Sequence, residues 1–189
     1  MPANLDKKLD DLYDLIDGIE VAMLTTRRQD GRLVSRAMQT QRRTSGTDLW
    51  FVTSVESPKL EELAFDPQVN VSYYRDRTRE WVSVSGRAIL SQDRDLIRGL
   101  YKPDWRAWFP DQGGKYDGSA TDPRIALILV EAESVTYFKK DKPAPLVLFE
   151  IAKGMVTGSR PKIGDERQLD ADELRAAAQK RQRKDELRT

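Results

Sequence analysis

The sequence predicts a mainly β protein with flanking helices, an α+β fold built on antiparallel strands. Several segments alternate apolar and polar residues over lengths typical of half-buried strands. The pair Asp30-Gly31 separates two of these segments, as in a tight hairpin. The apolar positions of residues 5–16 and 60–64 instead recur at helical spacing, so short helices should flank the strands.

The expected elements follow in order along the chain. A helix over 5–18 precedes strands at 21–26, 33–42 and 49–53, a helix at 58–65, strands at 69–74 and 81–90, a helix at 93–101 and a long strand at 125–140. Gly86 is the expected site of a bulge. Residues 102–124 have no period and are rich in Pro, Gly, Asp and Trp, which is typical of a functional loop. Segment 146–155 fits either a strand or a short helix.

The length of 189 residues and a hydrophobic content of 39% indicate one domain with one modest core. We expect this domain over residues 1–157. Residues 158–189 form a charged tail, either helical or flexible, in which Asp170 and Glu173 have the spacing of a capping box. The tail carries an excess of basic residues; it is interpreted as a solvated surface, with a nucleic-acid-binding arm as the alternative.

The composition excludes several kinds of chemistry. The chain has neither Cys nor His, which rules out disulfides, thiolate nucleophiles, Cys/His zinc sites and imidazole bases, so redox chemistry would need a cofactor and no metal site is expected. Its 32 basic and 31 acidic residues create no overall field toward nucleic acid or an anionic membrane. The start of the chain lacks a signal pattern and the longest apolar run, 125–130, is too short for a bilayer, so we expect a cytoplasmic protein.

The stretch from Ser35 to Lys59 gathers groups that suit a phosphate. Arg36 offers a planar fork and Lys59 a compact charge, with hydroxyls at Thr53, Ser54 and Ser57. Pro58 marks a helix start, capped by the Ser57 hydroxyl, whose free N–H groups and dipole would also attract an anion. This donor set suits the phosphate and ribityl chain of flavin mononucleotide (FMN). The alternatives are a surface ion pair for Arg36 and an exposed helix charge for Lys59.

The order of these signals resembles the pyridoxamine-5′-phosphate-oxidase-like flavoproteins, above all their branch of bacterial FMN-binding general stress proteins. The signals are the Asp-Gly hairpin, the strands Ser35-Arg36-Ala37-Met38 and Leu49-Trp50-Phe51-Val52-Thr53-Ser54, the helix start Ser57-Pro58-Lys59 and the Trp-containing loop. The resemblance covers about residues 5–155. It implies a six-stranded antiparallel split β-barrel with Greek-key connections and outer helices. It also implies a homodimer with FMN at each of two subunit interfaces.

The resemblance assigns roles to individual residues. It places the phosphate ligands at Arg36 and Lys59, with Thr53, Ser54 and Ser57 beside them. It implies that the strand residues Ala37, Met38 and Gln39 line the edge of the flavin ring, although core packing for Met38 and an ordinary surface position for Gln39 are the alternatives.

Aromatic residues complete the implied cofactor site. The resemblance gives Trp81 a contact with the flavin edge. Glu80 precedes it where the oxidases proper carry a glutamine, and an ionised carboxylate there could not donate to the ring carbonyls. Trp108 and Phe109 are implied to reach the flavin of the partner subunit, with Trp105 nearby. Alternatively these loop aromatics plug the open end of the barrel.

The expected function is that of an FMN-binding general stress protein that acts as a flavin-dependent oxidoreductase on an unknown small substrate. The alternative is a non-catalytic protein that binds or senses flavin or another planar cofactor. The oxidases proper carry a C-terminal Arg-x-His substrate motif, which a chain without His cannot have, so vitamin B6 oxidation is not expected. The carboxylates are scattered along the sequence, and no catalytic residue is assigned.

Overall fold

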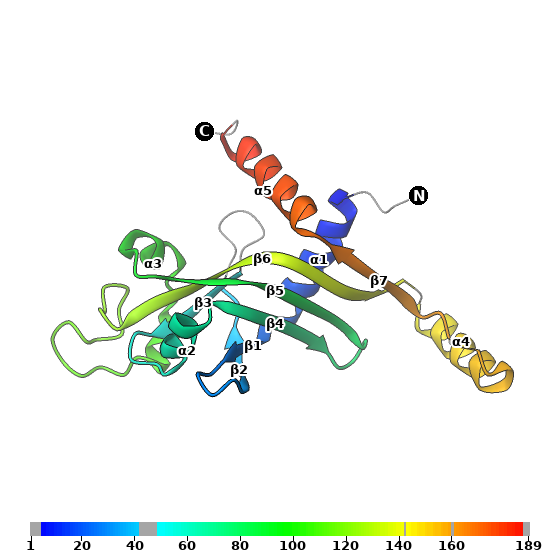
Figure 1. The fold of residues 1–189 in the computed structure, drawn as a ribbon, viewed down its shortest axis with the longest axis horizontal. Coiled ribbons are helices and arrows are strands. Elements are labelled where there is room, and N and C mark those ends of the chain that lie inside the picture. The colour runs from blue at the N-terminus through cyan, green and yellow to red at the C-terminus, as the bar shows by residue number, and fades with distance from the viewer. Residues whose placement is uncertain (1–4, 42–48, 142, 160, 187–189) are drawn as a thin grey trace.

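One antiparallel sheet of seven strands dominates the fold (Figure 1), seen in a computed structural model that describes residues 5–41, 49–141, 143–159 and 161–186. Six strands are ordered β2-β1-β4-β5-β6-β3, and β7 pairs with β6 beside this path. The strands are β1 Val21–Arg27, β2 Leu33–Gln39, β3 Leu49–Ser54, β4 Gln68–Arg75, β5 Glu80–Ser91, β6 Ile125–Lys140 and β7 Gly164–Leu169. The helices are α1 Leu5–Ile19, α2 Lys59–Phe65, α3 Arg94–Leu100, α4 Ala144–Thr157 and α5 Ala171–Glu186, with a 3-10 helix at Pro103–Ala107.

The sheet curls into a split barrel whose edge strands approach each other without forming a full ladder. Beyond the end of β2, Thr40 forms an isolated bridge with Phe51 of β3, and the N–H of Gln41 donates to the carbonyl oxygen of Trp50 at 2.7 Å. The expected antiparallel split-barrel architecture is confirmed. β7 adds a strand to the six that were expected. Arg42, where the second strand was expected to end, lies outside the described residues.

Two glycines adopt the roles that the sequence predicts. Gly31 has a φ of 82° in the turn between β1 and β2, where the N–H of Arg28 donates to the carbonyl oxygen of Arg32 at 2.9 Å. At Gly86 the pairing of β5 with β6 shifts its register, which confirms the bulge. A Cβ at Gly86 would lie 2.1 Å from the carbonyl oxygen of Glu131, so a larger residue would force the two strands apart.

Two buried clusters stabilise the fold. The larger one lies between the inner face of the sheet and the helices, and α1 contributes its apolar side, Leu9, Leu12, Tyr13, Leu15 and Ile16. The smaller one lies between β3, the start of β6, α3 and the 102–124 loop, and it consists of Trp50, Ile97, Leu100, Trp105, Phe109, Ile125 and Leu127. The long loop is therefore anchored by its own aromatic side chains.

Residues 164–186 pack against the rest of the fold, in the segment beyond residue 157 that the sequence predicts to be a charged tail, helical or flexible. β7 extends the sheet, and Leu169, Leu174 and Ala177 are at most 2% exposed within the larger cluster. The Asp170 carboxylate accepts the backbone N–H of Glu173 at 2.9 Å, and the Glu173 carboxylate accepts that of Asp170 at 3.2 Å. This reciprocal pair confirms the predicted capping box at the start of α5.

Segment 146–155, which periodicity left open, is part of the helix α4. This helix stands off the sheet on the β7 side (Figure 1) and exposes a set of large apolar side chains, Leu146, Leu148, Phe149, Met155 and Val156. Within the described ranges, no helix is both long and apolar enough to cross a membrane.

Candidate functional site

Arg36 lies on the inner face of β2, opposite the fully buried Leu24 of β1. Its guanidinium group is held by two side chains from neighbouring elements. Nη1 donates to Oγ1 of Thr26 on β1 at 2.7 Å, and Nη2 donates to Oε1 of Glu62 on α2 at 2.7 Å. Arg36 is therefore fixed between a strand and a helix rather than extended into solvent.

Lys59 is the first residue of α2 and is partly buried. Its Nζ donates to Oγ1 of the buried Thr53 on β3 at 3.0 Å. Among the residues that the structure describes, no carboxylate forms an ion pair with this ammonium group. Burial lowers the pKa of Lys59, the positive charge of Arg36 lowers it further, and the charge of Glu62 opposes this shift. Arg36 is therefore near enough to Lys59 for its charge to influence that ammonium group.

Glu62 is a member of this site that sequence reasoning missed. Its Oε2 accepts the hydroxyl of Thr26 at 2.6 Å, while Oε1 accepts Arg36. Burial alone would raise the pKa of Glu62, but the hydrogen bonds from Thr26 and Arg36 outweigh it and hold the pKa below its usual value. An acidic residue three positions after Lys59 on a short helix was a usable signal, because it must lie on the same side of α2.

The turn between β3 and α2 brings two further predicted residues near this pair. The N–H of Ser57 donates to the carbonyl oxygen of Ser54 at 3.0 Å, and Oγ of Ser54 accepts the N–H of Glu56 at 3.2 Å. Pro58 occupies the N-cap position, where no side chain caps the helix. The predicted cap by the Ser57 hydroxyl was therefore wrong, because Pro58 already has helical backbone angles and α2 begins one residue later.

A cavity of about 300 Å³ opens beside Glu62, between the β1–β2 hairpin and the start of α2. Its lining is Arg28, Gln29, Asp30, Pro58, Glu61 and Glu62. Three carboxylates against one guanidinium make this cavity unfavourable for an anion. The phosphate-compatible side of the site is the side of Arg36 and Lys59.

The β2 residues predicted to line the flavin ring divide between two faces of the strand. Met38 packs against the larger core cluster, which agrees with core packing, the alternative given for this residue. Ala37 and Gln39 pair with Met23 and Val21 on the outer face. Within one chain these side chains therefore do not converge with Arg36 on a single pocket.

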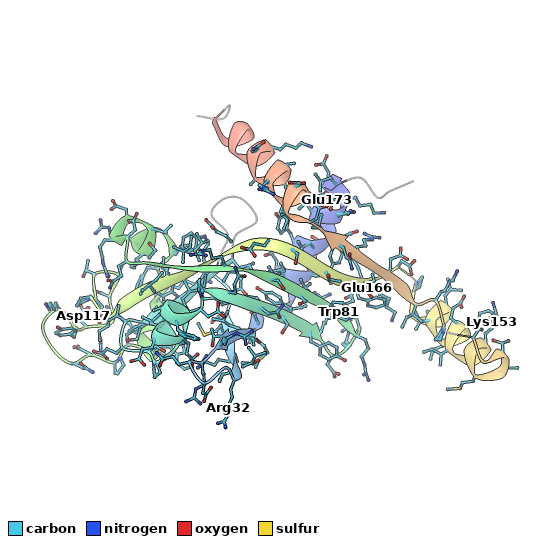
Figure 2. All side chains as sticks on the ribbon, in the orientation of Figure 1. Arg32, Trp81, Asp117, Lys153, Glu166 and Glu173 are labelled. Atoms are coloured by element: carbon cyan, nitrogen blue, oxygen red, sulfur yellow. The ribbon has the colours of Figure 1, made fainter. Side chains whose placement is uncertain are left out.

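Trp81 lies away from Arg36, near the β7 side of the sheet. Figure 2 shows Trp81 beside Glu166 of β7, whereas Arg32 marks the distant β1–β2 hairpin. A cavity of about 660 Å³ adjoins Trp81, lined by Arg79, Trp81, Phe138, Pro161, Lys162, Ile163, Gly164 and Glu166. Phe138 pairs with Trp81 across β5 and β6, so two aromatic side chains share one wall. Sequence reasoning missed Phe138, although it lies in a strand of predicted alternation.

Glu80 is engaged in holding the β4–β5 turn. Its buried carboxylate accepts Arg75 Nη1 at 3.0 Å, the Thr78 hydroxyl at 2.7 Å and the backbone N–H of Lys140 at 3.2 Å. These three contacts give the residue a structural role, which agrees with placing the ring contact at Trp81.

The loop aromatics also separate into two groups. Trp108 is 78% exposed, whereas Phe109 is 4% exposed and packs in the smaller cluster with Trp105. Phe109 and Trp105 thus pack against Trp50 of β3 and Leu127 of β6, which lie on the face opposite the larger cluster. Trp108 projects a large apolar surface outward from this loop, more exposed than Tyr116 at 38%.

A buried ion pair fixes the loop that carries Trp108. Asp122 and Arg124 have side chains that are 0% and 6% exposed, and Arg124 Nη2 lies 2.6 Å from Asp122 Oδ2. Nη2 of Arg124 also donates to the carbonyl oxygen of Pro110 at 3.0 Å, and its guanidinium lies over the rings of Phe109 and Tyr116. The exposure of Trp108 therefore belongs to an ordered loop.

The outer face of the sheet is uncharged over a broad central area. Cross-strand pairing places fifteen uncharged side chains in this central area, whereas the charged side chains of Arg27, Arg87, Glu131 and Glu166 lie around it on the same face. The uncharged fifteen are Ser35, Ala37, Gln39, Val21, Met23, Thr25, Asn70, Ser72, Tyr74, Trp81, Ser83, Ser85, Ser134, Thr136 and Phe138. Lack of charge distinguishes the core of an interface from ordinary surface.

The donor set fits a phosphate monoester. Arg36 supplies a guanidinium fork, Lys59 an ammonium group without an ion-pair partner among the described residues, and Thr53 a hydroxyl already aligned with that ammonium. A planar ring needs an aromatic or apolar wall, which the Trp81 and Phe138 cavity offers at another part of the chain. The cationic site and the aromatic cavity thus lie in different parts of the chain.

Comparison with known proteins identifies the family of this chain. The family model described as Pyridoxamine 5'-phosphate oxidase like matches residues 7–162. Protein bli-3 of Neurospora crassa is 35% identical over 175 residues, which cover 91% of this chain and 84% of that protein.

Solved structures share the fold. A protein of Clostridium acetobutylicum related to general stress protein 26 gives a TM-score of 0.64 at 15% identity, over 89% of this chain and 98% of that one. A pyridoxamine 5′-phosphate oxidase-related, FMN binding protein of Nostoc punctiforme gives 0.54 at 17% identity, over 71% and 81%. With a family match over most of its length and a curated relative of this identity, the chain belongs to the pyridoxamine 5′-phosphate oxidase like family.

Proposed function

We propose that this protein binds FMN, with the phosphate held by Arg36 and Lys59. The observation that carries the proposal is a partly buried ammonium group beside a fixed guanidinium, with no carboxylate paired to the ammonium in the described part of the chain. Two neighbouring cations in a partly desolvated site repel each other, and a dianionic ligand removes that cost. The name of the Nostoc relative, an FMN binding protein, supports the choice of ligand.

FMN, when bound, would supply electron transfer through its isoalloxazine ring. The residues of this chain would bind and orient it. Arg36 and Lys59 would hold the phosphate, Thr53 would fix the Lys59 ammonium, and Ser54 and Ser57 would offer hydroxyls along the ribityl chain. Trp81 and Phe138 would cover the ring.

The proposed assembly is a homodimer joined through the uncharged central area of the outer face. This face carries Trp81 and Phe138 and lies on the side of the sheet away from the core. Because β2 is an edge strand, a two-fold dimer that overlaps this edge would let the aromatic cavity of one copy approach the phosphate ligands of the other, which accounts for their separation in a single chain. The exposed Trp108 is a further proposed contact with the second copy.

The proposed activity is that of a general stress protein acting as a flavin-dependent oxidoreductase on a small substrate. A non-catalytic flavin carrier or sensor is the second candidate, and one observation favours it. The carboxyl groups whose pKa is shifted in the described chain, Asp11, Glu62, Asp117 and Asp122, are all shifted downward. None of these four is held protonated near neutral pH as a general acid would be. A cytoplasmic location stays a prediction from the sequence.

The test compares FMN with riboflavin, which lacks the phosphate. Protein freed of flavin should bind FMN about a hundredfold or more tightly than riboflavin, since each charge-assisted contact contributes about 1.5–3 kcal/mol. Arg36→Gln with Lys59→Met should remove most of this preference and leave riboflavin affinity nearly unchanged. Glutamine can still donate to Glu62, and methionine keeps the stem of Lys59.

The matched control removes two cations elsewhere. Arg27→Ala with Lys7→Ala changes the net charge equally, and both residues are exposed. This control should keep the preference for FMN, which flavin fluorescence titration will measure, with circular dichroism to verify folding. Equal affinity of the wild type for the two flavins would refute the phosphate site. Turnover in a screen of electron acceptors with the flavin reduced would separate the oxidoreductase from the carrier.

A further inference from the structure

Glu62 and Thr26 form a closed ring of hydrogen bonds with Arg36. Arg36 Nη1 donates to Thr26 Oγ1 at 2.7 Å, the Thr26 hydroxyl donates to Glu62 Oε2 at 2.6 Å, and Arg36 Nη2 donates to Glu62 Oε1 at 2.7 Å. Arg36 lies on β2, Thr26 on β1 and Glu62 on α2. Thr26 is fully buried, and the Glu62 side chain is 12% exposed. The ring is therefore an internal structure and not a surface ion pair.

The ring uses one edge of the guanidinium group. Thr26 and Glu62 together engage Nη1 and Nη2, the two nitrogens of the terminal edge. Among the described residues, none accepts a hydrogen bond from Nε of Arg36. The lateral edge, formed by Nε–H and the second hydrogen of Nη2, is left for an incoming acceptor. A phosphate can take two parallel hydrogen bonds from such an edge.

We propose that Glu62, together with Thr26, is a positioning residue that presents the lateral edge of Arg36 to the phosphate of the bound nucleotide. The inference rests on the proposed FMN site and adds a residue that does not touch the ligand. A free arginine must order a long flexible side chain when it binds, whereas the ring orders Arg36 beforehand.

The charge of Glu62 sets a second property of the site. Its carboxylate opposes the phosphate, while Arg36 and Lys59 attract it, so the three side chains sum to a single positive charge. If repulsion outweighed positioning, removal of Glu62 would tighten binding. The two effects therefore predict opposite signs, which makes the role of Glu62 measurable.

The experiment titrates FMN and riboflavin into flavin-free wild type, Glu62→Ala and Glu62→Gln. Glu62→Ala should raise the Kd for FMN about tenfold and leave the Kd for riboflavin within about twofold, the loss of roughly one charge-assisted contact. Glu62→Gln should recover most of the FMN affinity, because its amide oxygen still accepts from Arg36. The control is Glu61→Ala, an exposed carboxylate on the same helix, which should behave as wild type.

Several outcomes would overturn the positioning role. These are an unchanged FMN-to-riboflavin ratio in Glu62→Ala, tighter FMN binding in that variant, or an equal loss for both ligands, which would signify a structural role alone. Should Glu62→Ala not fold, Thr26→Val carries the same test, with an expected loss of about threefold for FMN only. A wild type without preference for FMN would instead overturn the FMN site itself.

Discussion

Replacing Asp122 by Asn should destabilise the 102–124 loop more than any other neutralisation of a loop carboxylate. Asp122 accepts the backbone N–H groups of Gly118 at 2.8 Å and Arg124 at 2.9 Å, and it also pairs with the guanidinium of Arg124. Both side chains are buried, so the variant leaves a positive charge without its counterion. The loop that carries Trp108 depends on this pair.

The magnitude follows from the electrostatics of the pair. The side-chain hydrogen bond from Arg124 is the main cause that lowers the pKa of Asp122 from 3.8 to about 2, against the effect of burial. At about 1.4 kcal/mol per unit, this shift corresponds to roughly 2.5 kcal/mol of stability at neutral pH. Removing one partner of a buried pair costs about 3–5 kcal/mol, because the remaining charge stays desolvated.

The assay is urea unfolding of wild type, Asp122→Asn and the control Asp111→Asn, followed by tryptophan fluorescence. Asp111 is an exposed carboxylate of the same loop. Because the folded-state pKa of Asp122 is lowered, its contribution is complete above about pH 4 and is lost as pH falls toward about 2. The difference between wild type and Asp122→Asn should therefore shrink by roughly 2 kcal/mol between pH 5 and pH 2, where Asp122 is half protonated in the folded state.

Two results would refute this reasoning. One is a difference below about 1 kcal/mol at pH 7, the size of an exposed ion pair. The other is a stability difference that stays constant as pH falls, because Asp122 is the carboxylate whose titration distinguishes the two proteins. Carboxylates common to both proteins cancel in the comparison.

Two further predictions concern packing. Gly86→Ala should lower the free energy of unfolding by about 1–3 kcal/mol, because its Cβ would lie 2.1 Å from the Glu131 carbonyl oxygen; a thermal melt equal to that of wild type would contradict the tight bulge. Leu174→Ala should cost about 2–5 kcal/mol in chemical unfolding, because Leu174 is buried in the core. Its control Leu146→Ala, on the exposed side of α4, should cost less than about 0.5 kcal/mol. Equal losses of stability in Leu174→Ala and Leu146→Ala would show that α5 contributes no packing to the core.

Much of the strand order could be predicted because the signals are local. The strand signal over 125–140 predicts β6 to the residue, and Asp30-Gly31 predicts the first hairpin, since turn chemistry and side-chain pattern act within a few residues. β7 could not be predicted from Gly164–Leu169, a polar segment whose only buried side chain is Leu169. It becomes a strand because the edge of β6 offers unpaired backbone groups.

The candidate site shows the same division. The residue types at Arg36 and Lys59 indicate an anion site, and the structure brings them into one electrostatic neighbourhood. Ala37 and Gln39 face away from Arg36 because neighbouring residues of a strand alternate between faces. Phe109, next to Trp108 in sequence, is buried while Trp108 is exposed. The sequence of this loop has no regular apolar pattern from which that difference could be predicted.

By itself, the sequence determined the secondary-structure type of most segments, the absence of Cys and His chemistry and the pair of cations suited to a phosphate, because these depend on residue identity and short-range spacing. Only the tertiary structure decided that Glu62 and Thr26 hold one edge of Arg36 and that Trp81 shares a cavity with Phe138. It also decided that the charged C-terminal segment completes the core. These depend on contacts between residues far apart in the chain, where the curvature of the sheet and the free edge of β6 select the partners.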